Sequence, residues 1–113
     1  MLALMKYALS MRTRKRDWFR QAADRGDAYA QYRVGRMYAR GRGAPRDYRK
    51  AYFWFSVAAA SGDLFQEDYA WHRDEAGRHL SQDERAEARL RAERWRSAAE
   101  ERTPKLVVEP REA

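Results

Sequence analysis

Two histidines and their acidic neighbours are the first residues whose types and spacing bear on chemistry. His72 and His79 are seven residues apart, and Asp68 and Glu75 stand four before and three after His72. On one helix these side chains would share a face, and imidazole with carboxylate is a ligand set that divalent metals accept. We favour the simpler interpretation, in which they form surface ion pairs with neighbouring arginines. The sequence therefore predicts no metal and no other cofactor.

No set of side chains has the spacing of a catalytic site. The chain has no Cys, which excludes a thiolate nucleophile and a Cys-ligated zinc site. Carboxylates adjacent in sequence, such as Asp83 and Glu84, point about 100° apart on a helix and cannot act on one substrate. The serines stand in no motif that would activate them, and the chain has no glycine-rich phosphate loop. We therefore predict that the protein is not an enzyme.

Three arginines recur on one stripe of a predicted helix from about residue 28 to residue 40. Arg33, Arg36 and Arg40 are spaced i, i+3 and i+7. Like charges at this spacing repel by roughly a few tenths of a kcal/mol per pair, so their clustering is easier to understand if something acidic meets them. We predict that these arginines, with Tyr29 and Tyr32 beside them, contact carboxylates or phosphates of a partner. The alternative is a merely solvated basic face.

The positive charge is concentrated in the first half of the chain. Residues 1–50 carry 14 Lys and Arg against 4 Asp and Glu, whereas residues 51–113 carry 10 against 13. A cationic half suits an acidic protein, a nucleic acid or an anionic membrane surface. Tyrosines such as Tyr48 and Tyr52 alternate with arginines, a pattern that supports stacking of bases. Nucleic-acid or polyanion binding is therefore the alternative to an acidic protein partner.

The composition predicts that helices position these side chains. The helix formers Ala, Arg and Glu are abundant, whereas the β-branched residues are only four Val and two Thr. A chain of 113 residues has room for one domain. No apolar run approaches the ~20 residues of a membrane span. The lack of Cys fits a reducing compartment, and we expect a cytoplasmic protein. Residues 1–16 have the composition of a transit peptide, but we favour an N-terminal helix with one apolar face.

An internal repeat is the strongest pattern in the sequence. Shifted by 36 positions, the chain matches itself as WFxxAAxxGD, through Trp18 and Trp54, Phe19 and Phe55, Ala22 and Ala58, Ala23 and Ala59, Gly26 and Gly62, and Asp27 and Asp63. A period in the mid-thirties is typical of stacked helix pairs. The rings and alanines fall on one helical stripe. We expect the following core residues: Trp18, Phe19, Ala22, Val34, Met37, Trp54, Phe55, Ala58 and Ala59.

Local signals set the ends of the predicted helices. Gly41 and Gly43 end the helix that begins near residue 28, and Asp47 is the expected N-cap of the next. Gly35 lies beside the apolar stripe of the first of these helices, where a missing side chain lets a neighbouring backbone approach. Ser81 and Glu84 have the spacing of a capping box, which opens a helix that runs to about Arg102.

The stretch from Ala28 to Asp63 closely resembles the Sel-one-like repeat, a relative of the tetratricopeptide repeats. The matching features are Ala30-Gln31, Val34-Gly35, Met37-Tyr38, Gly41-x-Gly43, Pro45, Asp47, Lys50-Ala51, Trp54, Ala58-Ala59 and Gly62. The resemblance implies an all-α fold, a short α-solenoid of about five helices in antiparallel pairs with a C-terminal capping helix. Residues 1–102 would form one domain, with a partial repeat at 16–27, a full repeat at 28–63 and capping helices at 64–102. Residues 103–113 would form a tail.

The resemblance also implies a function. Members of this family usually act as adaptors for protein complexes, often in bacterial signalling, secretion or host contact, and rarely as enzymes. We therefore predict a non-enzymatic protein–protein interaction module, an adaptor or a small inhibitor or immunity-type protein, that binds an acidic surface through a basic groove. Stacks need about three repeats to bury a continuous core. We therefore also expect self-association through the apolar residues of the first helix, Leu2, Leu4, Met5 and Leu9.

Overall fold

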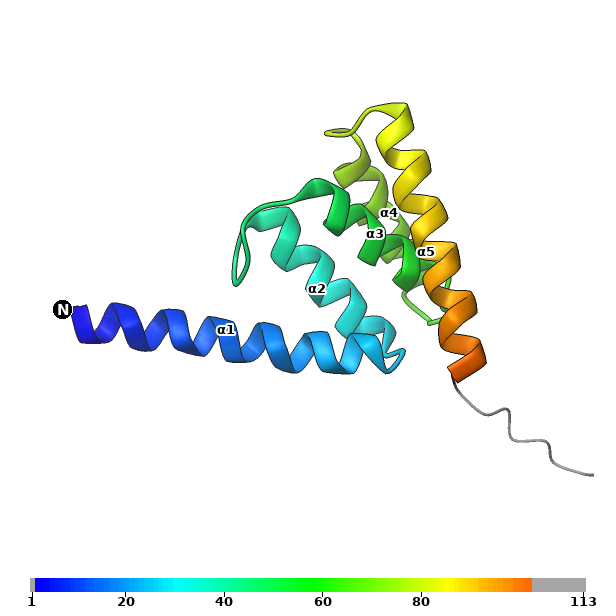
Figure 1. Cartoon of the computed structure of the whole chain (residues 1–113). Helices are drawn as coiled ribbons and strands as arrows, with labels where there is room; N and C mark the ends of the chain where they lie inside the picture. Colours follow the sequence, from blue (N-terminus) through cyan, green and yellow to red (C-terminus); the bar gives the residue numbers. More distant parts are fainter. Residues whose placement is uncertain (1, 103–113) are drawn as a thin grey trace, which may run out of the picture.

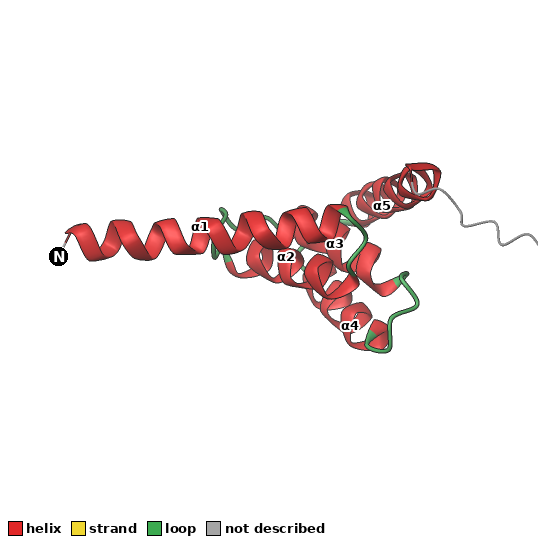
Figure 2. Cartoon of the chain, turned by 90° about the horizontal axis from the view of Figure 1, so that it is seen from below, coloured by secondary structure: helices red, strands yellow, loops and turns green. Residues whose placement is uncertain are grey.

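A computed structural model describes residues 2–102, which form five α-helices joined by short turns (Figure 1). The helices are α1 (Leu2–Asp24), α2 (Ala28–Arg40), α3 (Tyr48–Ala59), α4 (Gln66–Gly77) and α5 (Gln82–Arg102). Helices α2 and α3 form an antiparallel pair, whereas α4 and α5 each pack against α3 and diverge from one another (Figure 2). The described part of the chain contains no strand. The expected all-α solenoid is confirmed.

Helix α3 is the centre of the arrangement, because it packs against α2, α4 and α5. Its residues Ala51, Tyr52, Trp54, Phe55 and Ala58 are all buried. Helix α1 packs against α2, and its N-terminal part extends beyond the other helices (Figures 1 and 2). The expected self-association residues Leu2, Leu4 and Leu9 have side chains outside the described part of the chain.

The close approach expected at Gly35 involves a side chain and not a backbone. A Cβ on Gly35 would lie 2.6 Å from Cε1 of the Phe55 ring and 2.7 Å from Cδ1. The missing side chain of α2 therefore makes room for a large ring of α3. This contact holds the two helices of the full repeat together.

The expected helix ends are present in the structure. Asp47 caps α3, with a side-chain oxygen that accepts from the amides of Arg49 and Lys50. Gly41 ends α2 in the left-handed conformation, with φ of 67°. The capping box is reciprocal: Oγ of Ser81 accepts from the amide of Glu84 at 3.1 Å, and the amide of Ser81 donates to Oε1 of Glu84 at 2.9 Å. The ends of α2, α3 and α5 are thus set by local sequence.

The predicted burial of Trp18 is wrong. Trp18 is 65% exposed, although its repeat counterpart Trp54 is buried. Trp95 of α5 meets the Trp54 ring edge-on at 5.7 Å, and the guanidinium of Arg20 lies 5.0 Å from its centre. Trp18 contacts the neighbouring Phe19 ring of its own helix instead, at 4.9 Å. Four other residues that we expected in the core are only half-buried: Phe19, Ala22, Met37 and Ala59.

Candidate functional site: a basic pocket between α1 and α2

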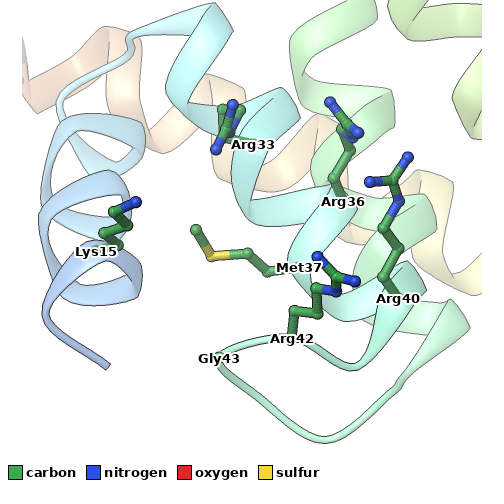
Figure 3. A pocket seen from close by; sticks show the side chains of 7 residues that line it. All are labelled: Lys15, Arg33, Arg36, Met37, Arg40, Arg42 and Gly43. Atoms are coloured by element: carbon green, nitrogen blue, oxygen red, sulfur yellow. The ribbon is translucent and has the colours of Figure 1, made fainter. Parts of the chain in front are cut away.

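Five cationic side chains converge on one pocket of about 270 Å³ (Figure 3). Its lining residues are Lys15 of α1, Arg33, Arg36, Met37 and Arg40 of α2, and Arg42 and Gly43 of the following loop. No carboxylate among the described side chains lines the pocket. Among the described residues, none of the five cations forms an ion pair. The pocket therefore concentrates positive charge that no ion pair among the described residues neutralises.

The structure brings together the three arginines that the sequence singles out, and it adds two cations. Lys15 comes from α1, on the other side of the pocket from α2 (Figure 3). Arg42 comes from the loop that closes the pocket at the C-terminal end of α2. Helical periodicity within α2 cannot identify either residue, because both reach the pocket through tertiary packing. Their presence turns a charged stripe into a pocket with walls on two helices.

Hydrogen bonds fix the loop that carries Arg42. The amides of Gly41 and Arg42 both donate to the carbonyl of Met37, so the chain turns back sharply. Nη1 of Arg16 on α1 donates to the carbonyl oxygen of Gly43 at 2.8 Å. Further along, the amide of Asp47 donates to the carbonyl of Tyr38 at 2.9 Å. The loop is thus tied to both helices that form the pocket.

Aromatic rings position two of the arginines. The guanidinium of Arg33 lies 4.9 Å from the centre of the Phe19 ring and 5.9 Å from that of Tyr29, and its Nη1 donates to the Tyr29 hydroxyl at 3.2 Å. The guanidinium of Arg36 lies 5.6 Å from the centre of the Tyr32 ring. Cation–π contacts restrain a guanidinium while leaving N–H donors for a ligand, so these arginines are partly preorganised.

The two tyrosines of the predicted contact set differ in position. Tyr29 is half-exposed beside Arg33 and can reach a partner. Tyr32 is only 9% exposed, its ring stacks on that of Tyr69 at 5.0 Å, and its hydroxyl lies 3.2 Å from Nε2 of His72. Tyr32 therefore packs in the core against α4, and its contact with a partner stays a prediction.

The histidines lie in a second hollow, which shares Arg36 and Arg40 with the basic pocket. This hollow, of about 230 Å³, is also lined by His72, Glu75 and His79. The His79 ring stacks face to face on Tyr48 at 3.9 Å. Among the described residues no group of three or more side chains could hold a metal ion. The His72 ring contacts Tyr32, as the His79 ring contacts Tyr48, so both histidines pack on aromatic rings beside the cations.

Burial lowers the pKa of His72, and the nearby charges of Arg36 and Arg40 act in the same direction, whereas Asp68 opposes them. Oδ2 of Asp68 lies 3.9 Å from Nε2 of His72. Lower pH therefore tends to add a further positive charge next to the basic pocket, at a cost in folding energy. The two arginines couple this histidine to the pocket electrostatically.

Antiparallel helix pairs stacked around a central helix place the protein among the α-solenoid proteins. A family model for the Sel1 repeat matches residues 16–27 and 28–63, so this stretch of the chain consists of Sel1 repeats. Sel1 repeats are generally non-catalytic protein–protein interaction modules. No curated protein and no solved structure matches the chain. No helix in the described range is both long enough and apolar enough to cross a membrane.

Proposed function

We propose that this protein is an adaptor or a small inhibitor that binds an acidic surface of another protein through the basic pocket. The observation that carries the proposal is the convergence of five cations with no carboxylate partner among the described residues. A partner that supplies carboxylates would relieve the mutual repulsion of these cations. Met37, between the arginines, offers an apolar contact to the same partner.

The arginines suit carboxylates in particular. A guanidinium presents N–H donors in a planar fork that matches the two oxygens of a carboxylate. Arg33 and Arg36 are held against rings, so less side-chain freedom is lost when they bind. The pocket opens to solvent, so side chains on the surface of a partner can enter it. Its volume of about 270 Å³ accommodates one or two side chains.

The test compares a basic-pocket variant with a variant of equal net charge. Arg33→Glu, Arg36→Glu and Arg40→Glu together should abolish binding of a short fluorescent peptide rich in Glu. The matched control is Arg78→Glu, Arg91→Glu and Arg94→Glu, which changes exposed arginines of α5 and of the end of α4. The control should bind the peptide with little loss. Equal loss in the two variants would show that net charge and not the pocket controls binding.

The same variants identify the natural partner. Proteins retained from the native host by the parent chain and by the control, but not by the basic-pocket variant, are the candidates for mass identification. The basic-pocket variant loses the ring contacts of Arg33 and Arg36, worth about 0.5–1 kcal/mol each. Its melting temperature must therefore be measured beside the binding, and it should stay folded at the assay temperature.

Nucleic-acid binding is the second candidate, and the exposed rings of Trp18 and Tyr29 near Arg33 favour it. The other tyrosines give it less support, because Tyr32 and Tyr52 are buried. A labelled single strand and a labelled duplex, titrated at several salt concentrations, distinguish the two candidates. Tight single-strand binding that persists at moderate salt, and is lost in Trp18→Ala, would favour nucleic acid over protein.

A further inference from the structure

Three large apolar side chains are exposed on α4 and just before it. Leu64 is 89% exposed, and Phe65 and Trp71 are each more than half exposed. The segment Asp63–Gly77 that carries them has five carboxylates and one arginine. We call Asp63, Leu64, Phe65, Glu67, Asp68 and Trp71 the acidic face.

The acidic face is held in place by the fold. Oδ1 of Asp63 accepts from the amide of Phe65 at 2.8 Å, and the carbonyl of Asp63 accepts from the amide of Gln66 at 3.0 Å. Tyr69, which is fully buried against Tyr32 of α2, anchors the first turn of α4. The exposure of the apolar residues is therefore a fixed feature of the surface. Exposed apolar side chains ringed by charge are typical of interaction sites.

The basic pocket has the complementary character. Arg33 of the pocket contacts the rings of Phe19 and Tyr29, and the exposed ring of Trp18 packs on Phe19. We call the five pocket cations together with Trp18 and Tyr29 the basic face. Each face thus combines large apolar side chains with charge of one sign, and the two signs are opposite.

We propose that the acidic partner of the basic face is the acidic face of a second copy of this chain. The inference rests on the proposed function and names the partner for the same pocket. Charge complementarity selects this occupant, because carboxylates such as Glu67 would meet the arginines while Leu64 and Trp71 cover exposed rings.

The contact must form between molecules. Within one molecule, the stacked rings of Tyr32 and Tyr69 hold α4 in place beside α2, and no residue of α4 lines the pocket between α1 and α2. A chain with one full repeat and part of another also gains buried surface when a second copy extends the stack.

Mixing two variants tests the proposal, because each keeps one intact face. The basic-face variant is Arg33→Glu with Arg36→Glu and Arg40→Glu. The acidic-face variant is Leu64→Ser with Glu67→Arg, two exposed positions. In sedimentation velocity across micromolar concentrations at low salt, the parent should self-associate and each variant alone should be monomeric. An equimolar mixture should regain a one-to-one complex, and added salt should weaken both assemblies.

The matched control for the acidic-face variant is Leu90→Ser with Glu93→Arg on α5, which should associate as the parent does. A parent that is monomeric at all concentrations, but binds the Glu-rich peptide through the arginines, would overturn this inference and leave the proposed function standing. A parent that is monomeric and also fails to bind the Glu-rich peptide would overturn both this inference and the proposed function. Salt-insensitive association that survives both variants would place the contact elsewhere, such as at Met5 of α1, and would also overturn the inference.

Discussion

Gly35 shows at the scale of one residue how tightly the full repeat is packed. The Phe55 ring occupies the space of the missing Cβ and is itself enclosed by Tyr32 at 5.9 Å and His72 at 5.6 Å. Gly35→Ala should therefore force α2 and α3 apart and cost about 1–3 kcal/mol of unfolding free energy. Urea denaturation of the parent and of Gly35→Ala measures this loss of unfolding free energy. A stabilised variant, as expected for Ala at an open helical position, would contradict the contact.

The two repeat-related tryptophans give a matched pair of substitutions. Trp54→Ala should lower the free energy of unfolding by about 3–5 kcal/mol, because Trp54 is buried between α5 and Arg20 of α1. Trp18→Ala should change it by less than about 0.5 kcal/mol, because the ring is mostly exposed. Chemical denaturation of both variants provides the comparison. Equal losses would mean that α1 packs as α3 does.

These tryptophans also mark what the sequence can predict at this scale. The repeat assigns Trp18 and Trp54 to the same position, and periodicity correctly places Trp54 in the core. Burial, however, depends on which helix is stacked on that position. Trp95 of α5 covers Trp54, and no aromatic residue of another helix covers Trp18 in the described structure. Identical residues at equivalent positions of two repeats therefore need not be equally buried.

His72 makes stability depend on pH. Its pKa in the folded protein is lowered, first by burial, so the unfolded chain binds a proton more readily. The contribution of neutral His72 to the free energy of unfolding is fully present above about pH 6.5, the pKa of histidine in the unfolded chain. It is lost as the pH falls below that value. The melting temperature should therefore fall from about pH 7.5 to about pH 5.5. His72→Gln should reduce that fall, whereas His79→Gln, which keeps His72, should retain it.

At the scale of elements, the capping box decides where α5 begins. Glu84 bonds to the amide of Ser81 and also pairs with Arg49 of α3 at 2.6 Å, and the hydrogen bond to Ser81 is the main reason that the pKa of Glu84 is lowered. Ser81→Ala removes the acceptor for the amide of Glu84 and should cost about 0.5–2 kcal/mol. Thermal unfolding measures the loss, and Ser81→Asp, which restores an acceptor, should recover most of it.

Element ends were predictable because their causes are local. Asp47, Gly41 and Ser81 each act on backbone groups within a few residues, so the sequence alone indicates them. The pocket was predictable only in part for the converse reason. Arg33 and its helical neighbours share a stripe that periodicity reveals, whereas Lys15 arrives from another helix. The long-range ring contacts that bury Tyr32 leave no local pattern either.

At the scale of the whole molecule, α3 is the helix against which α2, α4 and α5 all pack. Nη2 of Arg89 donates to the Tyr52 hydroxyl at 2.8 Å, and Trp95 packs on Trp54. The buried residues Ala88 and Ala92 show that α5 supplies part of the core. In a stack whose units contact only their neighbours, an end helix stabilises all that lies beneath it.

A chain that ends at Leu80 should therefore lose more than α5. Removal of α5 exposes Trp54 and leaves Tyr52 without its arginine partner, so the remaining helices should unfold without a cooperative transition. Circular dichroism should show a loss of helix larger than the share that α5 contributes. A chain that ends at Arg102 keeps all five helices and is the control. If the shorter chain melts cooperatively with four intact helices, α5 is an appendage and α2 to α4 form a self-sufficient core.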